Sequence, residues 1–141
     1  MQIREVLAHK GSDVVHAPPG ATVAELVALL RAHDLGALVV SSDGRQVAGI
    51  VSERDVVRHL DEPDLLDRPV SAIMTSLVCS CTPTDSVESV MALMTERRVR
   101  HVPVLSPTGT LAGIVSIGDV VKSQLAELAF ERDQLQTYVS G

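Results

Sequence analysis

A serine followed three residues later by an aspartate occurs twice in the 141-residue chain, each time directly after the tripeptide Gly-Ile-Val. One copy runs from Gly49 to Asp55 and the other from Gly113 to Asp119. A short carboxylate suits a sugar diol, and a hydroxyl beside free helix N–H groups suits a phosphate. The two motifs therefore fit a nucleotide. A second interpretation stays open, because Ser-x-x-Asp is also a cap that starts a helix.

The two motifs belong to an internal repeat of sixty-four residues. Aligning residues 14–57 with residues 78–121 without a gap gives 15 identities over 44 positions. Average residue usage predicts roughly 3 such identities by chance. The duplication therefore predicts two equivalent structural units with two related sites.

Each unit is predicted to contain a strand, a helix, two further strands and a second helix. In the first unit the strands are 14–17, 37–40 and 47–51, and a capping box from Thr22 to Glu25 starts the first helix. In the second unit the strands are 78–81, 102–105 and 111–115, and Asp85 with Glu88 is expected to cap the helix. A proline ends the first strand of each unit, Pro18 in the first unit and Pro83 in the second.

One such unit cannot cover its own sheet. We therefore expect two β-α-β-β-α repeats packed face to face with pseudo-two-fold symmetry, an α/β (α+β) fold. The predicted boundaries are 1–62 for the first repeat with its N-terminal lead-in, 63–75 for a linker with a short helix, 76–124 for the second repeat and 125–141 for a C-terminal helical tail.

The last helix is predicted to continue from Ile117 to about Val139, because neither Pro nor Gly interrupts it after Gly118. Apolar residues recur along it at alternating spacings of four and three, with Arg132 in one of these places. The sequence favours a partner surface on this helix. The alternative is that the tail folds back over its own core.

A dense basic run extends from Glu96 to His101 and leads into a predicted strand. We expect Arg100 and His101 to face a phosphate at the second Ser-x-x-Asp motif. The equivalent residues of the first repeat are uncharged, so Arg54 is the phosphate candidate at the first motif. The two sites should therefore differ in affinity, and we expect the second motif to be the one that reports its occupancy.

The composition narrows the function class. The formal net charge of −6 argues against general binding to nucleic acid or an anionic membrane. We expect neither a signal peptide nor a membrane span, and a cytoplasmic location. The five histidines show no metal-ligand spacing, and no sequence motif for catalysis occurs. Cys79 and Cys81 are interpreted as two reduced thiols, with redox sensing as the alternative.

The duplicated frame with its Gly-h-h-Ser-x-x-Asp ends, where h is apolar, resembles a tandem pair of CBS (cystathionine-β-synthase-type) domains, and the chain is similar to stand-alone bacterial CBS-pair proteins. The resemblance covers residues from about 3 to 125. It implies that adenosine ligands such as AMP, ADP, ATP, S-adenosylmethionine or NAD(H) bind between the repeats, and that the protein forms a homodimer.

The resemblance also implies roles for individual residues. Ribose contacts fall to Asp55 and Asp119, ribose-phosphate contacts to Ser52 and Ser116, adenine contacts to Ile50 and Ile114, and phosphate contacts to Arg100 and His101. His16, Ala17 and Pro18 would complete the second site, and Cys81, Thr82 and Pro83 the first. The first repeat has Val39 where the second has Pro103, a departure that concerns the ligand of the first site.

The sequence thus predicts a non-catalytic regulatory module that binds an adenine nucleotide and signals its occupancy to a partner protein through dimer geometry. Energy sensing through AMP or NAD(H) is the expected setting, with no metal and no catalytic cofactor. The alternative is an interaction module with vestigial clefts that binds its partner through the C-terminal helix. An enzyme acting on a bound nucleotide would need a nucleophile or base that the sequence does not display.

Overall fold

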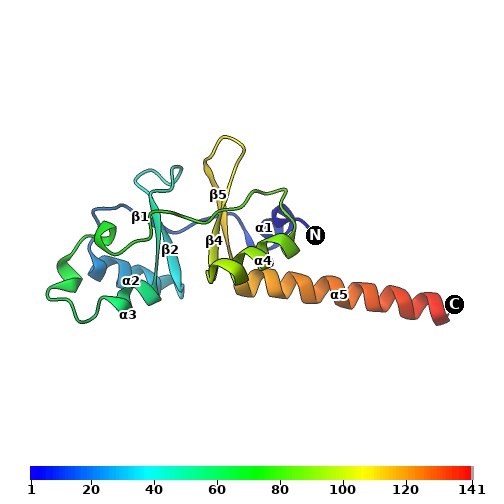
Figure 1. Cartoon of the computed structure of the whole chain (residues 1–141). Coiled ribbons are helices and arrows are strands. Elements are labelled where there is room, and N and C mark those ends of the chain that lie inside the picture. The colour runs from blue at the N-terminus through cyan, green and yellow to red at the C-terminus, as the bar shows by residue number, and fades with distance from the viewer. Residues whose placement is uncertain (141) are drawn as a thin grey trace.

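The computed structural model describes residues 1–140 and divides them into two halves that lie side by side (Figure 1). The first half contains a three-stranded sheet and two helices. Its elements are β1 (His16–Ala17), α2 (Val23–His33), β2 (Ala37–Val40), β3 (Gly49–Ser52) and α3 (Glu53–Arg58), followed by the 3-10 turns η1 (Leu65–Asp67) and η2 (Val70–Ala72).

The second half repeats this order with one strand fewer. Its elements are α4 (Val87–Arg97), β4 (His101–Leu105), β5 (Leu111–Ser116) and α5 (Ile117–Ser140), and the N-terminal helix α1 (Ile3–Lys10) packs on this half. The α/β architecture of two repeats packed face to face, with a long C-terminal helix, confirms the fold class predicted from the sequence.

The two sheets share one pairing scheme. In the first, β1 runs parallel to β2 and β2 antiparallel to β3, and in the second, β4 runs antiparallel to β5. The predicted strand 78–81 is reduced to a single bridge between Cys81 and Val104. Cys81 lies beside Pro103, which has no N–H, so the ladder lacks the donor it needs to continue toward residue 78. The equivalent residue of the first repeat is Val39, which has an N–H, and β1 pairs with β2 there.

Capping side chains set where the helices begin. Thr22 and Glu25 form the predicted capping box of α2, with the Glu25 N–H donating to Oγ1 of Thr22 at 3.1 Å. The predicted cap of α4 is wrong by one residue. Ser86 is the N-cap and accepts from the Ser89 N–H at 3.0 Å, whereas Asp85 accepts from the Thr82 N–H. Asp85 therefore closes the turn before the helix.

Each half is completed by the segment that precedes the other repeat. The Ile3 N–H of α1 donates to the Asp85 carbonyl of the second repeat at 2.9 Å. Correspondingly, the Val70 N–H of η2 donates to the Ala21 carbonyl of the first repeat at 2.7 Å. We call these two segments, residues 1–10 and 68–77, the lead-ins. Counterparts in the two lead-ins are sixty-seven residues apart.

The exchange of lead-ins produces two separate apolar cores. The core of the first repeat includes Leu65, Val70 and Ile73, and that of the second includes Ile3, Val6 and Leu7. Each core also contains the apolar faces of its own helices and strands. Neither repeat therefore buries its apolar surface with its own residues alone.

Helix α5 continues well past the second repeat. Its 24 residues span about 36 Å at 1.5 Å per residue, and it projects away from both halves (Figure 1). Every residue from Phe130 to Ser140 is exposed, so the alternative that the tail folds back over its own core is wrong. None of the helices within residues 1–140 has both the length and the apolar character needed to cross a bilayer.

Position 49 requires glycine because a lead-in approaches its backbone closely. A Cβ on Gly49 would lie 2.8 Å from the Thr75 carbonyl oxygen and 2.7 Å from Sδ of Met74. We expect Gly49→Ala to destabilise the protein by about 1–3 kcal/mol, because the backbone at Thr75 must shift. Urea unfolding measures this, with Gly20→Ala as the control because nothing lies within 4 Å of a Cβ there. Equal effects of the two substitutions would contradict this account.

Candidate functional site

The first Ser-x-x-Asp motif forms the turn between β3 and α3. The Ser52 N–H and hydroxyl donate to Oδ2 of Asp55 at 2.8 and 3.1 Å, and the Asp55 N–H approaches Oγ of Ser52 at 3.4 Å. The carboxylate is largely buried, with 9% of the residue exposed. Within residues 1–140, all its hydrogen bonds use Oδ2. Oδ1 is therefore available to a ligand.

A cleft of about 950 Å³ opens beside this motif and is lined by both repeats. The first repeat contributes the start of β2, the end of β3 and the outer side of α3, including Ser52 and Asp55. The linker contributes Thr75, and the segment that follows it, at the start of the second repeat, contributes residues 77–79. The second repeat contributes the C-terminal end of α4 and the turn into β4, residues 97–101. The volume lies in the range of small-molecule sites in proteins.

The walls of this cleft are strongly basic although the chain is acidic. Five arginines line it, and they face only two carboxylates, those of Glu53 and Asp55; the arginines are Arg54, Arg58, Arg97, Arg98 and Arg100. Within residues 1–140, none of the five makes an ion pair. Guanidinium groups are well suited to binding phosphate. The cleft is thus a locally positive surface on an acidic chain.

His101 lies where the two repeats meet. A Cβ on Gly36 of the first repeat would be 3.4 Å from Cε1 of His101, so glycine leaves room for the ring. Burial and the Lys10 ammonium lower the pKa of the His101 imidazole, although the carboxylates of Asp119 and Glu53 oppose this. The ring is therefore neutral at neutral pH, and the arginines supply the positive charge of the cleft.

The second Ser-x-x-Asp motif has the same cap, but a lysine side chain already binds its aspartate. The Ser116 N–H donates to Oδ2 of Asp119 at 2.8 Å, as in the first motif. The Lys10 ammonium of α1 donates to the same oxygen at 2.5 Å. Burial alone would raise the pKa of Asp119, but Lys10 and Ser116 outweigh it and hold the pKa below its usual value.

Lys10 and Leu77 each follow a matched contact of the two lead-ins by three residues. Leu7 packs on Gly113 as Met74 packs on Gly49, but beyond these contacts α1 stays helical to Lys10 whereas Thr75 pairs with Ile50 as a bridge. Leu77 is exposed and lines the cleft at the first motif. The symmetric frame thus places a cation against one aspartate and an apolar side chain near the other.

The structure distributes the predicted site residues unevenly. Six line the cleft: Ile50, Ser52, Arg54, Asp55, Arg100 and His101. The sequence analysis placed Arg100 and His101 at the second motif, whereas in the structure they line the cleft of the first. The His101 backbone nevertheless pairs with Ser116. Ile114, Ser116 and Asp119 lie together at the second motif, on β5 and the first turn of α5.

Residues 81–83, which the sequence analysis assigned to the first site, do not line its cleft. The assignment of His16, Ala17 and Pro18 to the second site stays a prediction. Ala17 is fully buried in the first core, while His16 and Pro18 are exposed on either side of it. Cys81 is buried in the second core. Thr82 bonds to Asp85, and the carbonyl of Pro83 accepts from Arg4 of α1. The second repeat instead lines the cleft with Val78 and Cys79, just before the predicted Cys81.

The two cysteines have different environments. Both are free, with Cys79 half-buried and Cys81 buried. Burial, with a smaller contribution from Asp85, raises the pKa of Cys81 to about 12, so this thiol is protonated and weakly nucleophilic. Within residues 1–140, no cluster of three or more His, Cys, Asp or Glu side chains is arranged to hold a metal ion.

Sequence reasoning missed Lys10, Arg58, Arg97, Arg98 and the linker residues of the cleft. Arg97 and Arg98 lie in the basic run, but the sixty-four-residue register says nothing about which motif that run faces. The two lead-ins follow a second register, of sixty-seven residues, which has little sequence identity to reveal it. Only the exchange of lead-ins shows that Lys10 lies at the second motif and Leu77 at the first.

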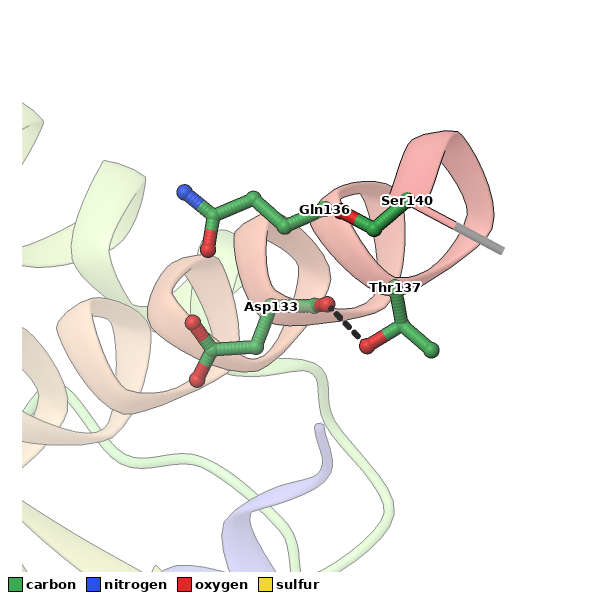
Figure 2. Close-up of a pocket in the computed structure, with 4 residues that line it drawn as sticks. All are labelled: Asp133, Gln136, Thr137 and Ser140. Atoms are coloured by element: carbon green, nitrogen blue, oxygen red, sulfur yellow. Dashed lines mark hydrogen bonds between the residues drawn. The ribbon is translucent and has the colours of Figure 1, made fainter.

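A second opening lies on the tail of α5 and has a different character. Figure 2 shows its four side chains, Asp133, Gln136, Thr137 and Ser140, on successive turns of one helix. The Thr137 hydroxyl donates to the Asp133 backbone carbonyl at 3.0 Å. Because a single exposed helix supplies the whole lining, this is a surface groove between side chains and holds no enclosed site.

Comparison with known proteins identifies the family. The CBS domain family model matches residues 3–62 and again residues 70–126. The chain is 38% identical over 126 residues to the CBS domain-containing protein CBSX3, mitochondrial, of Arabidopsis thaliana. That alignment covers 85% of this chain and 61% of CBSX3, so the chain spans about three fifths of this relative.

Two solved structures share the fold over nearly their whole length. The CBS-domain containing protein ATU1752 from Agrobacterium tumefaciens has a TM-score of 0.82 and 41% identity, and the match covers 88% of this chain and 99% of that one. The CBS domain protein PAE2072 from Pyrobaculum aerophilum, solved in complex with AMP, has a TM-score of 0.80 and 29% identity over 92% of this chain and 99% of that one. The chain belongs to the CBS domain family and carries two CBS domains in tandem.

Proposed function

We propose that this protein is a non-catalytic regulatory module that binds an adenine nucleotide, AMP, ADP, ATP or NAD(H), in the cleft at the first Ser-x-x-Asp motif. The observation that carries the proposal is the set of five arginines without ion pairs that line this cleft with the Asp55 carboxylate, three of them, Arg97, Arg98 and Arg100, from the opposite repeat. The complex of PAE2072 with AMP supports the choice of ligand class.

The chemistry of the cleft matches the parts of a nucleotide. Oδ1 of Asp55 accepts hydrogen bonds from a ribose diol without disturbing the cap, because the cap uses Oδ2. Ile50 offers an apolar contact to the base. The arginines of α4 and the following turn bind the phosphate. A ligand that satisfies all three contacts bridges the first and the second repeat.

This bridging is the basis of the proposed signal. A nucleotide held by Asp55 on one side and Arg98 or Arg100 on the other favours the relative position of the repeats that suits both contacts. It shifts the conformational equilibrium only by the difference in its affinity for the two arrangements. We propose that a homodimer transmits this shift to a regulated protein.

A second candidate function rests on the exposed apolar residues of α5, among them Leu125 and Leu135. In that case the protein binds its partner through this helix and the clefts are vestigial. Calorimetric titration with AMP, ADP, ATP, NAD and NADH separates the candidates, because heat from at least one ligand is expected for the nucleotide module. No heat from any of them would refute the nucleotide module.

Replacing Asp55 by asparagine tests the ribose contact. The amide side chain keeps an oxygen for the cap but loses its charge, which lowers the contribution of each hydrogen bond to the diol from about 1.5–3 kcal/mol to about 0.5–1.5 kcal/mol. We expect AMP to bind roughly ten- to a hundredfold more weakly, measured by calorimetry. Asp61→Asn, at an exposed position shortly after α3, serves as the control and should bind AMP normally. An Asp55→Asn protein with unchanged AMP affinity would refute the assignment of this carboxylate.

Replacing Arg100 by glutamine tests the phosphate contact. The variant should bind AMP at least fivefold more weakly while its affinity for adenosine, which has no phosphate, stays the same. Arg31→Gln, on the exposed face of α2, is the matched control and should change neither affinity. Equal losses for AMP and adenosine would show that Arg100 acts on the fold of the cleft and not on phosphate.

The second motif is proposed to bind nucleotide weakly, because a ribose must displace Lys10 from Asp119. In Lys10→Met the pKa of Asp119 should rise, and NMR titration of the carboxyl measures it. The lowered pKa in the native protein means that the ion pair stabilises the fold above the ordinary aspartate pKa, and that this contribution is lost as the pH falls through the lowered one. An Asp119 pKa that does not change in Lys10→Met would contradict the pairing.

A further inference from the structure

His101 brings an imidazole ring into the wall of the cleft at the first motif. The residue begins β4 of the second repeat, and its ring reaches across to the first repeat. A Cβ on Gly36 would lie 3.4 Å from Cε1 of this ring and 3.7 Å from Nε2. The Gly36 carbonyl accepts from the Glu53 N–H at 3.0 Å, so the ring lies close to the start of α3. Within residues 1–140, His59 has the only imidazole in a hydrogen bond, which leaves both ring nitrogens of His101 uncommitted.

Charged groups on four segments act on this ring. Lys10 of α1 and the neighbouring Arg100 disfavour a proton on it, whereas the carboxylates of α3 and α5 favour one. These carboxylates belong to Glu53 and Asp119. Burial is the largest influence, and with the two cations it outweighs the carboxylates and lowers the pKa of the imidazole. At neutral pH the protein therefore holds a neutral ring in a cleft wall that is rich in arginines.

We infer that His101 takes up a proton from solvent when the phosphate of a nucleotide enters the cleft, so that the protein's affinity for nucleotide is linked to pH. This inference rests on the proposed function, because it needs a phosphate among the arginines of the cleft. An anion within about 4–6 Å favours the charged form of an imidazole. The phosphate also offsets the positive charge of Arg100, and its oxygens accept a hydrogen bond from the newly protonated ring nitrogen.

The direction of the pH dependence follows from the sign of this change. The bound phosphate raises the pKa of His101 above its value in the protein without nucleotide. The added affinity is fully present below the pKa of the nucleotide-free protein and is lost as the pH rises through the pKa of the complex. If the pKa rises by about one, the affinities at the two pH limits differ by about tenfold.

The ligand has a pH dependence of its own that opposes this effect. A phosphate monoester has a second pKa of about 6, so AMP loses charge in the same pH range. The contribution of the protein must therefore be measured against a variant without the imidazole. His101→Gln is suited to this because glutamine stays neutral at every pH and keeps a polar side chain in the cleft wall.

NMR titration measures the proton uptake at the ring itself. The His101 signal is assigned by its absence from His101→Gln. Without nucleotide the pKa of His101 should lie below the ordinary histidine value of about 6.5, and with saturating AMP it should rise by roughly 0.5 or more. A pKa of His101 that is the same with and without AMP would overturn the inference.

Calorimetry separates a role in protonation from a role in the fold. AMP is titrated into the native protein and into His101→Gln in two buffers with different heats of ionisation, neither of them phosphate. Near the pKa of His101, the native protein should take up more protons per AMP than the variant does. At a pH where the ring is neutral with and without AMP, both proteins should bind AMP within about twofold of each other. His33→Gln, at the exposed end of α2, is the matched control and should match the native protein at every pH.

The other outcomes of the calorimetry are equally informative. A His101→Gln protein that binds AMP more weakly by the same factor at every pH would show that the ring only shapes the cleft, and this would overturn the inference. Equal proton uptake by the two proteins would overturn it as well, while AMP binding itself would leave the proposed function intact. No heat from any adenine nucleotide at any pH would refute the proposed function and this inference with it.

Discussion

The exchange of lead-ins is the interaction on which the rest of the structure depends. Backbone hydrogen bonds attach α1 to the second repeat and η2 to the first. The apolar residues of each lead-in complete the core of the repeat to which it is attached. Because the chain crosses between the halves in this way, the linker after η2 passes over the first Ser-x-x-Asp motif. The same exchange places the end of α1 over the second motif. The walls of both sites thus follow from it.

A symmetric frame with different side chains gives the two sites opposite electrostatics. The backbone turn and the cap are alike at Asp55 and Asp119. The first site has arginines from the opposite repeat and an apolar Leu77, whereas the second has Lys10 bonded to its aspartate. The difference therefore arises from residues at the periphery of the motifs. In the proposed function, one site is open to an anionic nucleotide and the other is held by an internal cation.

Much of the fold could be predicted from the sequence because the two repeats carry the same local signals. The capping box at Thr22 and the continuous apolar run from Ala37 to Val40 specify a helix and a strand through residues that are close in sequence. The structure has both elements where they were expected. The loss of the strand before Cys81 depends on a missing donor at Pro103 in a neighbouring strand. The direction in which Arg100 faces depends on how the two repeats dock. Contacts between distant segments determine both, and periodicity does not encode them.

A crystal structure of the protein grown with AMP would test the central claim most directly. The account predicts a nucleotide in the cleft of the first motif, with its ribose on Oδ1 of Asp55 and its phosphate among Arg97, Arg98 and Arg100, while Lys10 remains bonded to Asp119. A nucleotide bound at Asp119 beside a displaced Lys10, with the first cleft empty, would contradict it.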